Sequence, residues 1–238
     1  MKKLVITTMA IFMAALMNVT TAQTLQEVLE KHFKAIGQEQ LMAANSFYVK
    51  AKVSQMGMDL PMEMKIKKPG KFITTIDFQG QKIITAFDGE KGWMINPMMG
   101  ADPQDLAGEQ LAQAQSQADM EGELYNFEAK GGSAELAGKV TIEGKELFRI
   151  KYTGKDGNTK DYFIDAKTYL IDRVKAKVSA QGQTVEIEQI MGDYKTTDGI
   201  TMAMKIDQKT PMGSVSIIME QVKINENFDD SVFKRPAK

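Results

Sequence analysis

The stretch that decides the fold is SFYVKAKVS at residues 46–54, which is followed by LPMEMKIK at residues 60–67. In both segments an apolar side chain stands at every second position, and mainly polar side chains fill the positions between. Such alternation predicts β-strands, because successive side chains of a strand point to opposite sides of the sheet. The two segments therefore indicate a sheet with one apolar face.

The same alternation returns along most of the chain. Short turns such as Gln79-Gly80 and Asp88-Gly89 separate the repeats, and turns of this length join antiparallel neighbours. We expect a mainly β protein with some α: a single curved antiparallel sheet, or half-open β-barrel, of about 10–12 strands. A flat two-sheet sandwich is the alternative. The expected strands lie near residues 46–56, 59–67, 71–79, 81–88, 91–96, 139–143, 145–153, 159–165, 169–179, 183–194, 200–209 and 214–224.

Two segments carry helical signals instead. The sequence Thr24-Leu25-Gln26-Glu27 matches a capping box, and the helix that it begins should end at Gly37, with a short continuation over residues 39–44. Pro103 predicts the start of a second helix over residues 103–121, whose apolar stripe is mostly alanine. Residues 122–138 should be irregular. We expect both helices to cover the same face of the sheet.

The first residues read as an export signal. Lys2 and Lys3 precede the apolar run Leu4–Met17, and small residues end at Ala22. The apolar run is short for a membrane span, and no cysteine follows to carry a lipid. We therefore expect a signal peptide at residues 1–22 and a single exported domain at residues 23–238.

The composition gives no sign of catalysis or of nucleic-acid binding. The chain has 30 Lys and Arg against 31 Asp and Glu, and these residues alternate along the strands without forming a basic face. It has no cysteine and one histidine, His32, expected at the surface of the first helix. Disulfides, thiol catalysis and zinc or haem ligand sets are thereby excluded. We predict a protein that is not an enzyme and has neither cofactor nor metal.

Methionine and tryptophan leave two questions open. The spacing Met56-x-Met58 and Met62-x-Met64 places thioethers on one face of a strand, which suits Cu(I); it equally suits an adaptable apolar lining. The second interpretation is the one we favour. Trp93 is either a core anchor or a residue at the mouth of a cavity.

Short motifs beyond the leader carry a resemblance to a known family. They are LQEVLEKHFKAIG at 25–37, DGEKGW at 88–93, DYFID at 161–165, GDY at 192–194 with DG at 198–199, and NENFDDSVFKRP at 225–236. In these motifs the chain resembles the outer-membrane lipoprotein-sorting protein family, the LolA-like periplasmic carriers and their relatives.

The resemblance implies a half-open barrel whose concave face, covered by helices that act as a lid, holds an acyl chain. It implies a monomer in the periplasm whose partners are a lipoprotein acyl chain or lipid and envelope membrane proteins. Leu106 and Leu111 would belong to the lid. The ligand-binding residues would be Phe47, Val49, Met62, Met64, Phe72, Phe78, Trp93, Met202, Met204, Ile217 and Met219.

One departure from the family concerns arginine. The well-studied carriers latch the lid with an arginine on an early strand, whereas this chain has arginine only at Arg149, Arg173 and Arg235. The prediction is therefore a carrier for an acyl chain, lipid or other apolar ligand. A non-catalytic envelope sensor with a filled core is the alternative, and Met-based Cu(I) binding is third.

Overall fold

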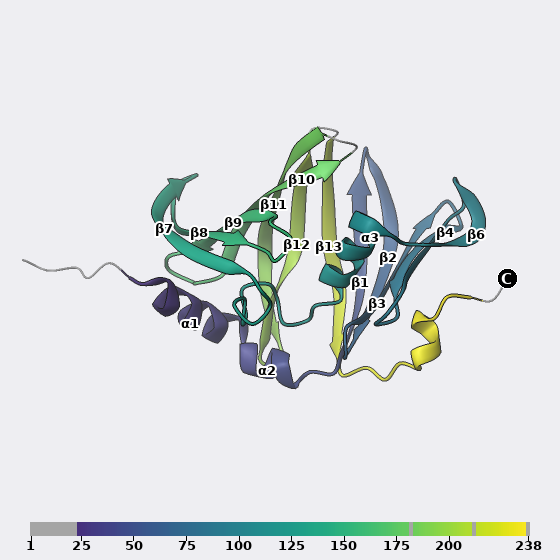
Figure 1. Cartoon of the computed structure of the whole chain (residues 1–238), viewed down its shortest axis with the longest axis horizontal. Helices are drawn as coiled ribbons and strands as arrows, with labels where there is room; N and C mark the ends of the chain where they lie inside the picture. Colours follow the sequence, from purple (N-terminus) through teal and green to yellow (C-terminus); the bar gives the residue numbers. More distant parts are fainter. Residues whose placement is uncertain (1–22, 181–182, 211–212, 237–238) are drawn as a thin grey trace, which may run out of the picture.

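One continuous sheet, bearing helices on one face, makes up the computed structural model (Figure 1), which describes residues 23–180, 183–210 and 213–236. The expected signal peptide at 1–22 lies outside the described residues. The strands are β1 (Ser46–Gln55), β2 (Met58–Lys67), β3 (Lys71–Phe78), β4 (Gln81–Phe87), β5 (Gly92–Asn96), β6 (Gly100–Asp105), β7 (Ser133–Ile142), β8 (Lys145–Thr153), β9 (Thr159–Asp165), β10 (Ile171–Ala180), β11 (Gln183–Thr197), β12 (Ile200–Thr210) and β13 (Gly213–Ile224).

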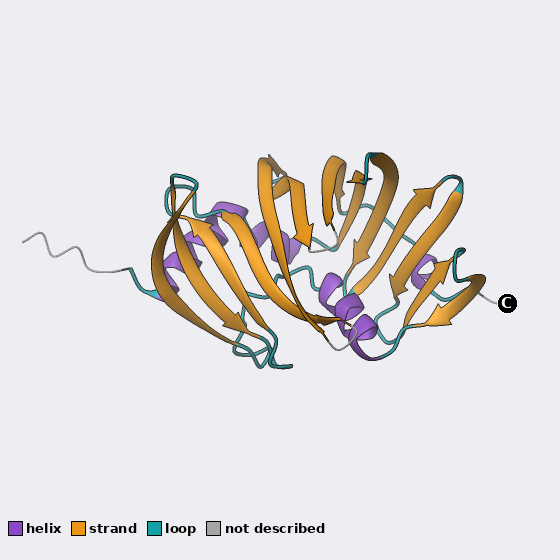
Figure 2. Ribbon diagram, turned by 90° about the horizontal axis from the view of Figure 1, so that it is seen from above, coloured by secondary structure: helices purple, strands orange, loops and turns teal. Residues whose placement is uncertain are grey.

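The 13 strands follow the order β6-β5-β4-β3-β2-β1-β13-β12-β11-β10-β9-β8-β7. The first and last strands meet at the centre, where Phe47 of β1 pairs with Ile224 of β13 in antiparallel register. β6 and β7 are the free edges, so the sheet does not close. The expected single antiparallel sheet is confirmed, and its strands continue into one curved surface (Figure 2).

The N-terminal helices form as the sequence predicts. α1 (Leu25–Ile36) begins with a capping box in which Thr24 and Glu27 bond each other's backbone N–H groups. It ends at Gly37, whose φ of 72° is the left-handed conformation that glycine adopts most readily. The same glycine precedes α2 (Gln38–Ala43).

The expected helix over residues 103–121 is wrong at its start. Residues 100–105 form β6, with Met94 of β5 opposite Gln104, and α3 spans only Gly108–Gln117. Pro103 can lie here because β6 is an edge strand, where a missing N–H leaves no ladder bond unmade. This additional strand takes the sheet past the expected number.

The segment expected to be irregular, residues 122–138, also differs in part. β7 starts at Ser133 and pairs with β8, with Leu136 opposite Ile150. Leu136 packs against the apolar side chains beneath α1, and this tertiary contact is not readable from the local sequence.

The three α-helices lie on the same face of the sheet, which we call the helix face. It carries the side chains of Val49 on β1, Phe72 on β3 and Ile150 on β8. The other face, which we call the opposite face, carries the C-terminal tail with its short helix η1 (Asp230–Phe233). The expected placement of an N-terminal and a mid-chain helix on one side is confirmed.

Candidate ligand-binding face

α1 fills one end of the helix face. Val28 and Leu29 pack against a buried cluster that includes Phe148, Ile150 and Ile164 from β8 and β9. His32 follows them on the same side of α1 and is only 3% exposed, so the expectation of a surface histidine is wrong. Its Nδ1 lies 2.8 Å from the carbonyl oxygen of Tyr169, a bond that ties α1 to the β9–β10 turn. Burial lowers the pKa of His32, and the bond to Tyr169 opposes this shift.

α3 fills the other end. Ala114 and Ala118 pack against Phe72 and Phe87, so the alanine stripe seen in the sequence does face the sheet. The two residues expected in the lid, Leu106 and Leu111, pack in the same place. Small side chains bury little area, and α3 is anchored mainly by the two leucines and the phenylalanines beneath them.

The segment after α3 is held by a charged cluster that the sequence did not suggest. Glu123 accepts bonds from Lys160 Nζ at 2.6 and 2.7 Å and from the hydroxyl of Tyr162. Burial raises the pKa of Tyr162 well above its ordinary value, and the nearby Glu123 carboxylate raises it further. The cluster attaches the segment that links α3 and β7 to strand β9. This segment therefore crosses the helix face from one end to the other.

Between the two filled ends lies an apolar strip with no helix above it. Its centre is formed by Val49, Ala51, Val53 and Met62, which are buried. Within the described residues, no helix side chain belongs to this cluster. Partly exposed apolar residues lie beside them on the same face, and we call six of these the open strip: Leu60, Met64, Ile76, Val215, Ile217 and Met219.

A small residue lies at the centre of the strip. Ala51 of β1 is opposite Met62 on one side and Met219 on the other. β13 carries one extra residue at this point, since Lys50 pairs with Gln221 and Ala51 with Met219. An alanine flanked by two flexible methionines leaves a surface that can adapt to different apolar shapes.

The structure places ten of the eleven expected ligand-binding residues on the helix face. Val49, Met62, Met64, Ile217 and Met219 lie together in the open strip or directly beside it. The others lie beside it: Phe47 and Met202 beneath α2, Phe72 beneath α3, and Phe78 and Met204 farther along their strands by register. Leu60, Ile76 and Val215 were missed, although the same period of two would have included them.

Trp93 is the exception, since its side chain lies on the opposite face. Phe87, on the helix face, pairs with Gly92, and this register turns the next residue away from the helices. The indole N–H of Trp93 donates to the carbonyl oxygen of Phe233 over 2.8 Å, within the C-terminal tail. Trp93 therefore anchors the tail and does not line the open strip.

The two methionine pairs lie in different surroundings. Met62 is buried, and Met64 is partly exposed on the open strip, while Met56 and Met58 are exposed at the β1–β2 turn. At the rise of an extended strand, Met58 and Met62 are about 13 Å apart. Across the described residues, no group of three or more His, Cys, Asp or Glu side chains could hold a metal.

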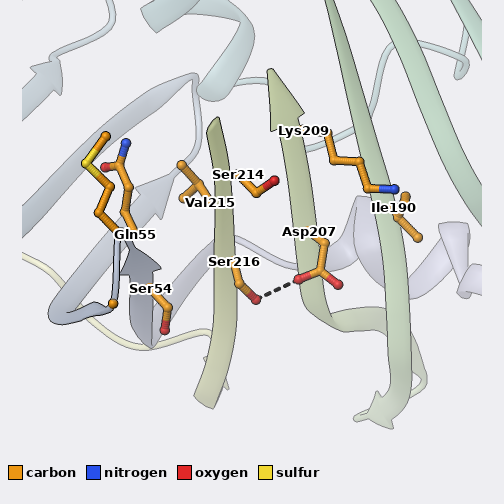
Figure 3. A pocket seen from close by; sticks show the side chains of 10 residues that line it. Ser54, Gln55, Ile190, Asp207, Lys209, Ser214, Val215 and Ser216 are labelled. Carbon is orange, nitrogen blue, oxygen red and sulfur yellow. Dashed lines mark hydrogen bonds between the residues drawn. The ribbon is translucent and has the colours of Figure 1, made fainter. Parts of the chain in front are cut away.

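The opposite face holds a hollow of about 470 Å³ near the β12–β13 turn (Figure 3). Ser216 donates its hydroxyl to Asp207 Oδ1 over 2.7 Å, and this bond is the first cause of the lowered pKa of Asp207. A carboxylate held in its ionised form is a weak general base. The hydroxyl of Ser54, on the same wall, is bonded to Asp59. The hollow has no activated nucleophile among these groups.

None of the helices in the described part of the chain has the length and apolar character needed to cross a bilayer. No family model matches the sequence, and no curated protein matches it either.

Solved structures, in contrast, match nearly the whole chain. A DUF1329 family protein from Desulfovibrio piger has a TM-score of 0.62 at 13% identity, covering 87% of this chain and 97% of that one. A LolA superfamily protein from Nitrosomonas europaea has a TM-score of 0.60 at 14% identity, covering 90% and 98%. An outer-membrane lipoprotein-sorting protein domain from Vibrio parahaemolyticus has 0.58 at 12%, covering 85% and 97%.

The chain has a LolA-like fold. At these identities the likeness is one of architecture, and it agrees with the resemblance found in the sequence motifs. The LolA-like sheet explains why the apolar alternation repeats on strand after strand. One face of the sheet packs against three helices, and its apolar side chains continue between them as the open strip.

The arginines of this LolA-like chain do not reach the mid-chain helix. Arg149 pairs with Asp161 at 2.8 and 2.9 Å, and Arg173 binds Asp172 at 2.9 Å, both on the opposite face. Arg235, in the tail, lies 3.1 Å from Asp105 of β6. Among the described residues, no bond joins any of the three to α3. Instead, α3 is held by apolar packing, and the segment that follows it is held by the Glu123 cluster.

Proposed function

We propose that the protein is a non-catalytic carrier that holds a fatty-acyl chain or similar apolar ligand on the open strip, and that it works in the periplasm. The observation that carries the proposal is the strip itself. Six partly exposed apolar side chains lie beside a buried apolar centre on the helix face, between two ends that the helices fill. A continuous apolar surface that remains open in a folded protein marks a binding site.

The binding energy would come from exclusion of water alone. Each methylene that leaves water contributes about 0.8 kcal/mol, so an acyl chain of about 14 carbons is worth on the order of 10 kcal/mol before the costs of ordering it. Met64 and Met219 supply flexible, polarizable contacts that suit a ligand of variable shape. No reactive group is needed for such a carrier. The LolA-like fold agrees with this use of the helix face.

Neighbouring residues of β13 provide a sharp test. Ile217 and Met219 lie on the open strip, whereas Ile218, between them, is 37% exposed on the opposite face. In a titration with a fluorescent palmitate analogue, the Ile217→Gln, Met219→Gln variant should bind with an affinity lower than that of the wild type by about tenfold or more. The matched control, Ile218→Gln, should bind as the wild type does.

Two results would contradict the proposal. One is wild-type protein that binds no acyl probe and carries no lipid when isolated from its own cell envelope and examined by native mass spectrometry. The other is an equal loss of affinity in the strip variant and the Ile218→Gln control, because binding would then not depend on the helix face.

A further inference from the structure

The sheet order brings three hairpin turns together at one end of the strands. β1–β2, β3–β4 and β5–β6 are adjacent antiparallel pairs, so their turns lie next to one another at the same end of the strands (Figure 1). We call these turns, residues 55–58, 78–81 and 96–101, the hairpin rim. The β2–β3 and β4–β5 turns lie at the other end of the same strands.

The hairpin rim exposes most of the large apolar side chains that face solvent. Five such side chains are exposed in the described part of the chain, and four of them are rim methionines. Met56 is 79% exposed, Met58 41%, Met98 65% and Met99 66%. Exposed apolar residues gathered at one edge, on neighbouring turns, indicate a contact surface.

The rim also lacks charge. Its sequences, QMGM, FQGQ and NPMMGA, contain no ionisable side chain, although 26% of the chain is charged. The turns at the other end of these strands differ: residues 67–71 include three lysines, and residues 87–92 include Asp88, Glu90 and Lys91. The difference between the two ends is not a general property of turns in this protein.

The backbone at Met56 adds an independent observation. Its φ is 51°, in the left-handed region where glycine, asparagine and aspartate are the favoured residues. Apart from Tyr169, the other described non-glycine residues with positive φ are polar: Gln79, Asn126, Glu143, Asp193, Asp198 and Asn225. An exposed methionine at this position gains nothing for the turn, which points to a role outside the fold.

We infer that the hairpin rim docks on a lipid bilayer, with the four methionines entering the interface between headgroups and acyl chains. The rim suits a bilayer because its three turns contain no ionisable side chain, so no charge has to leave water when the methionines enter the interface. The charged residues next to the rim have both signs, with Asp59, Asp77 and Asp102 against Lys82, so the rim has no basic border. Docking therefore does not require anionic lipid. The inference stands whether or not the open strip holds an acyl chain.

Vesicle flotation tests this surface. The chain from Gln23 onward, which contains every described element, is mixed with phosphatidylcholine vesicles at low and high salt. We expect the protein to float with the vesicles at both salt concentrations. For the variant Met56→Gln, Met58→Gln, Met98→Gln, Met99→Gln, the partition coefficient into the vesicles should fall by about tenfold or more, because four apolar side chains are lost. Its thermal unfolding should match that of the wild type, since all four are exposed.

A conservative variant provides the matched control. Met58→Leu, Met98→Leu, Met99→Leu keeps the apolar character and leaves the strained position at Met56 unchanged, so it should float as the wild type does. The inference is overturned if the wild type does not float, if the glutamine variant floats equally well, or if binding needs anionic lipid and disappears at high salt.

Discussion

Gly92 of β5 lies beside Leu106, and a Cβ added to the glycine would come within 2.9 Å of the leucine Cδ1. The same Cβ would be 3.0 Å from Cδ1 of Leu111 on α3. The backbone N–H of Leu106 donates to the carbonyl oxygen of Gly92 over 2.8 Å, so these residues cannot easily separate. The mid-chain helix is seated on the sheet at a point where a Cβ in place of the glycine hydrogen would press on both leucines.

The first prediction concerns this seat. Gly92→Ala should lower the free energy of unfolding by about 1–3 kcal/mol, because the added methyl group overpacks the two leucines. It should also make α3 more sensitive to limited proteolysis. Gly192→Ala is the matched control: Gly192 is also in a strand, and its Cβ would meet nothing within 4 Å. Equal stability of the two variants in urea denaturation would contradict this account of the seat.

The second prediction concerns the C-terminal tail. Phe233 is fully buried, and its carbonyl accepts the indole N–H of Trp93. Phe233→Ala should cost about 3–5 kcal/mol of stability, as for other buried phenylalanines. Trp93 is the only tryptophan in the chain, so its emission should shift to longer wavelength in this variant. Lys234→Ala, at an exposed neighbour, should change neither quantity; a shift of similar size there would show that Trp93 does not report on Phe233.

The third prediction concerns the Glu123 cluster. Glu123→Gln removes the negative charge that holds Lys160 and leaves one oxygen to accept from both Lys160 and Tyr162, which should cost about 1–2 kcal/mol after allowing for partial exposure. Hydrogen exchange should rise in residues 119–132. Because Glu123 raises the pKa of Tyr162, that tyrosine should titrate at lower pH in the variant, as followed by phenolate absorbance. Glu128→Gln, an exposed change in the same segment, serves as the control. Unchanged exchange in Glu123→Gln would argue against the cluster as the anchor.

The fourth prediction concerns pH. Burial lowers the pKa of His32 below its ordinary value of 6.5, so the unfolded chain binds a proton at His32 more readily than the folded chain does. His32 therefore makes stability rise with pH between its lowered folded pKa and 6.5. As pH falls from 6.5 through the folded pKa, this stability is lost. Urea denaturation at a series of pH values should show the dependence in the wild type and a weaker one in His32→Gln; identical slopes would mean that His32 is not the group responsible.

Much of the fold was readable from local pattern. The period of two in residues 46–67 follows from the geometry of a strand, and the capping box at Thr24 and the glycine at Gly37 bound α1 as predicted. Ten of the expected face residues lie on one face because alternation is a local property. Each of these features depends only on residues close together in the chain.

Other features depended on distant partners. Residues 100–105 have a helix-start signal at Pro103, but pairing with β5 makes them a strand. His32 has the sequence context of a surface residue, and it is buried because the β9–β10 turn, far along the chain, closes over it. Local propensity is a weak preference that tertiary pairing overrides.

Sequence pattern alone was enough to predict one apolar sheet face and two helical segments. Only the tertiary structure decided which part of that face stays open, that Trp93 turns to the other side, and that uncharged methionine turns gather at one rim. The physical reason is that alternation is set within each strand. Cover, register between strands and the meeting of turns are set by contacts between residues far apart in the chain.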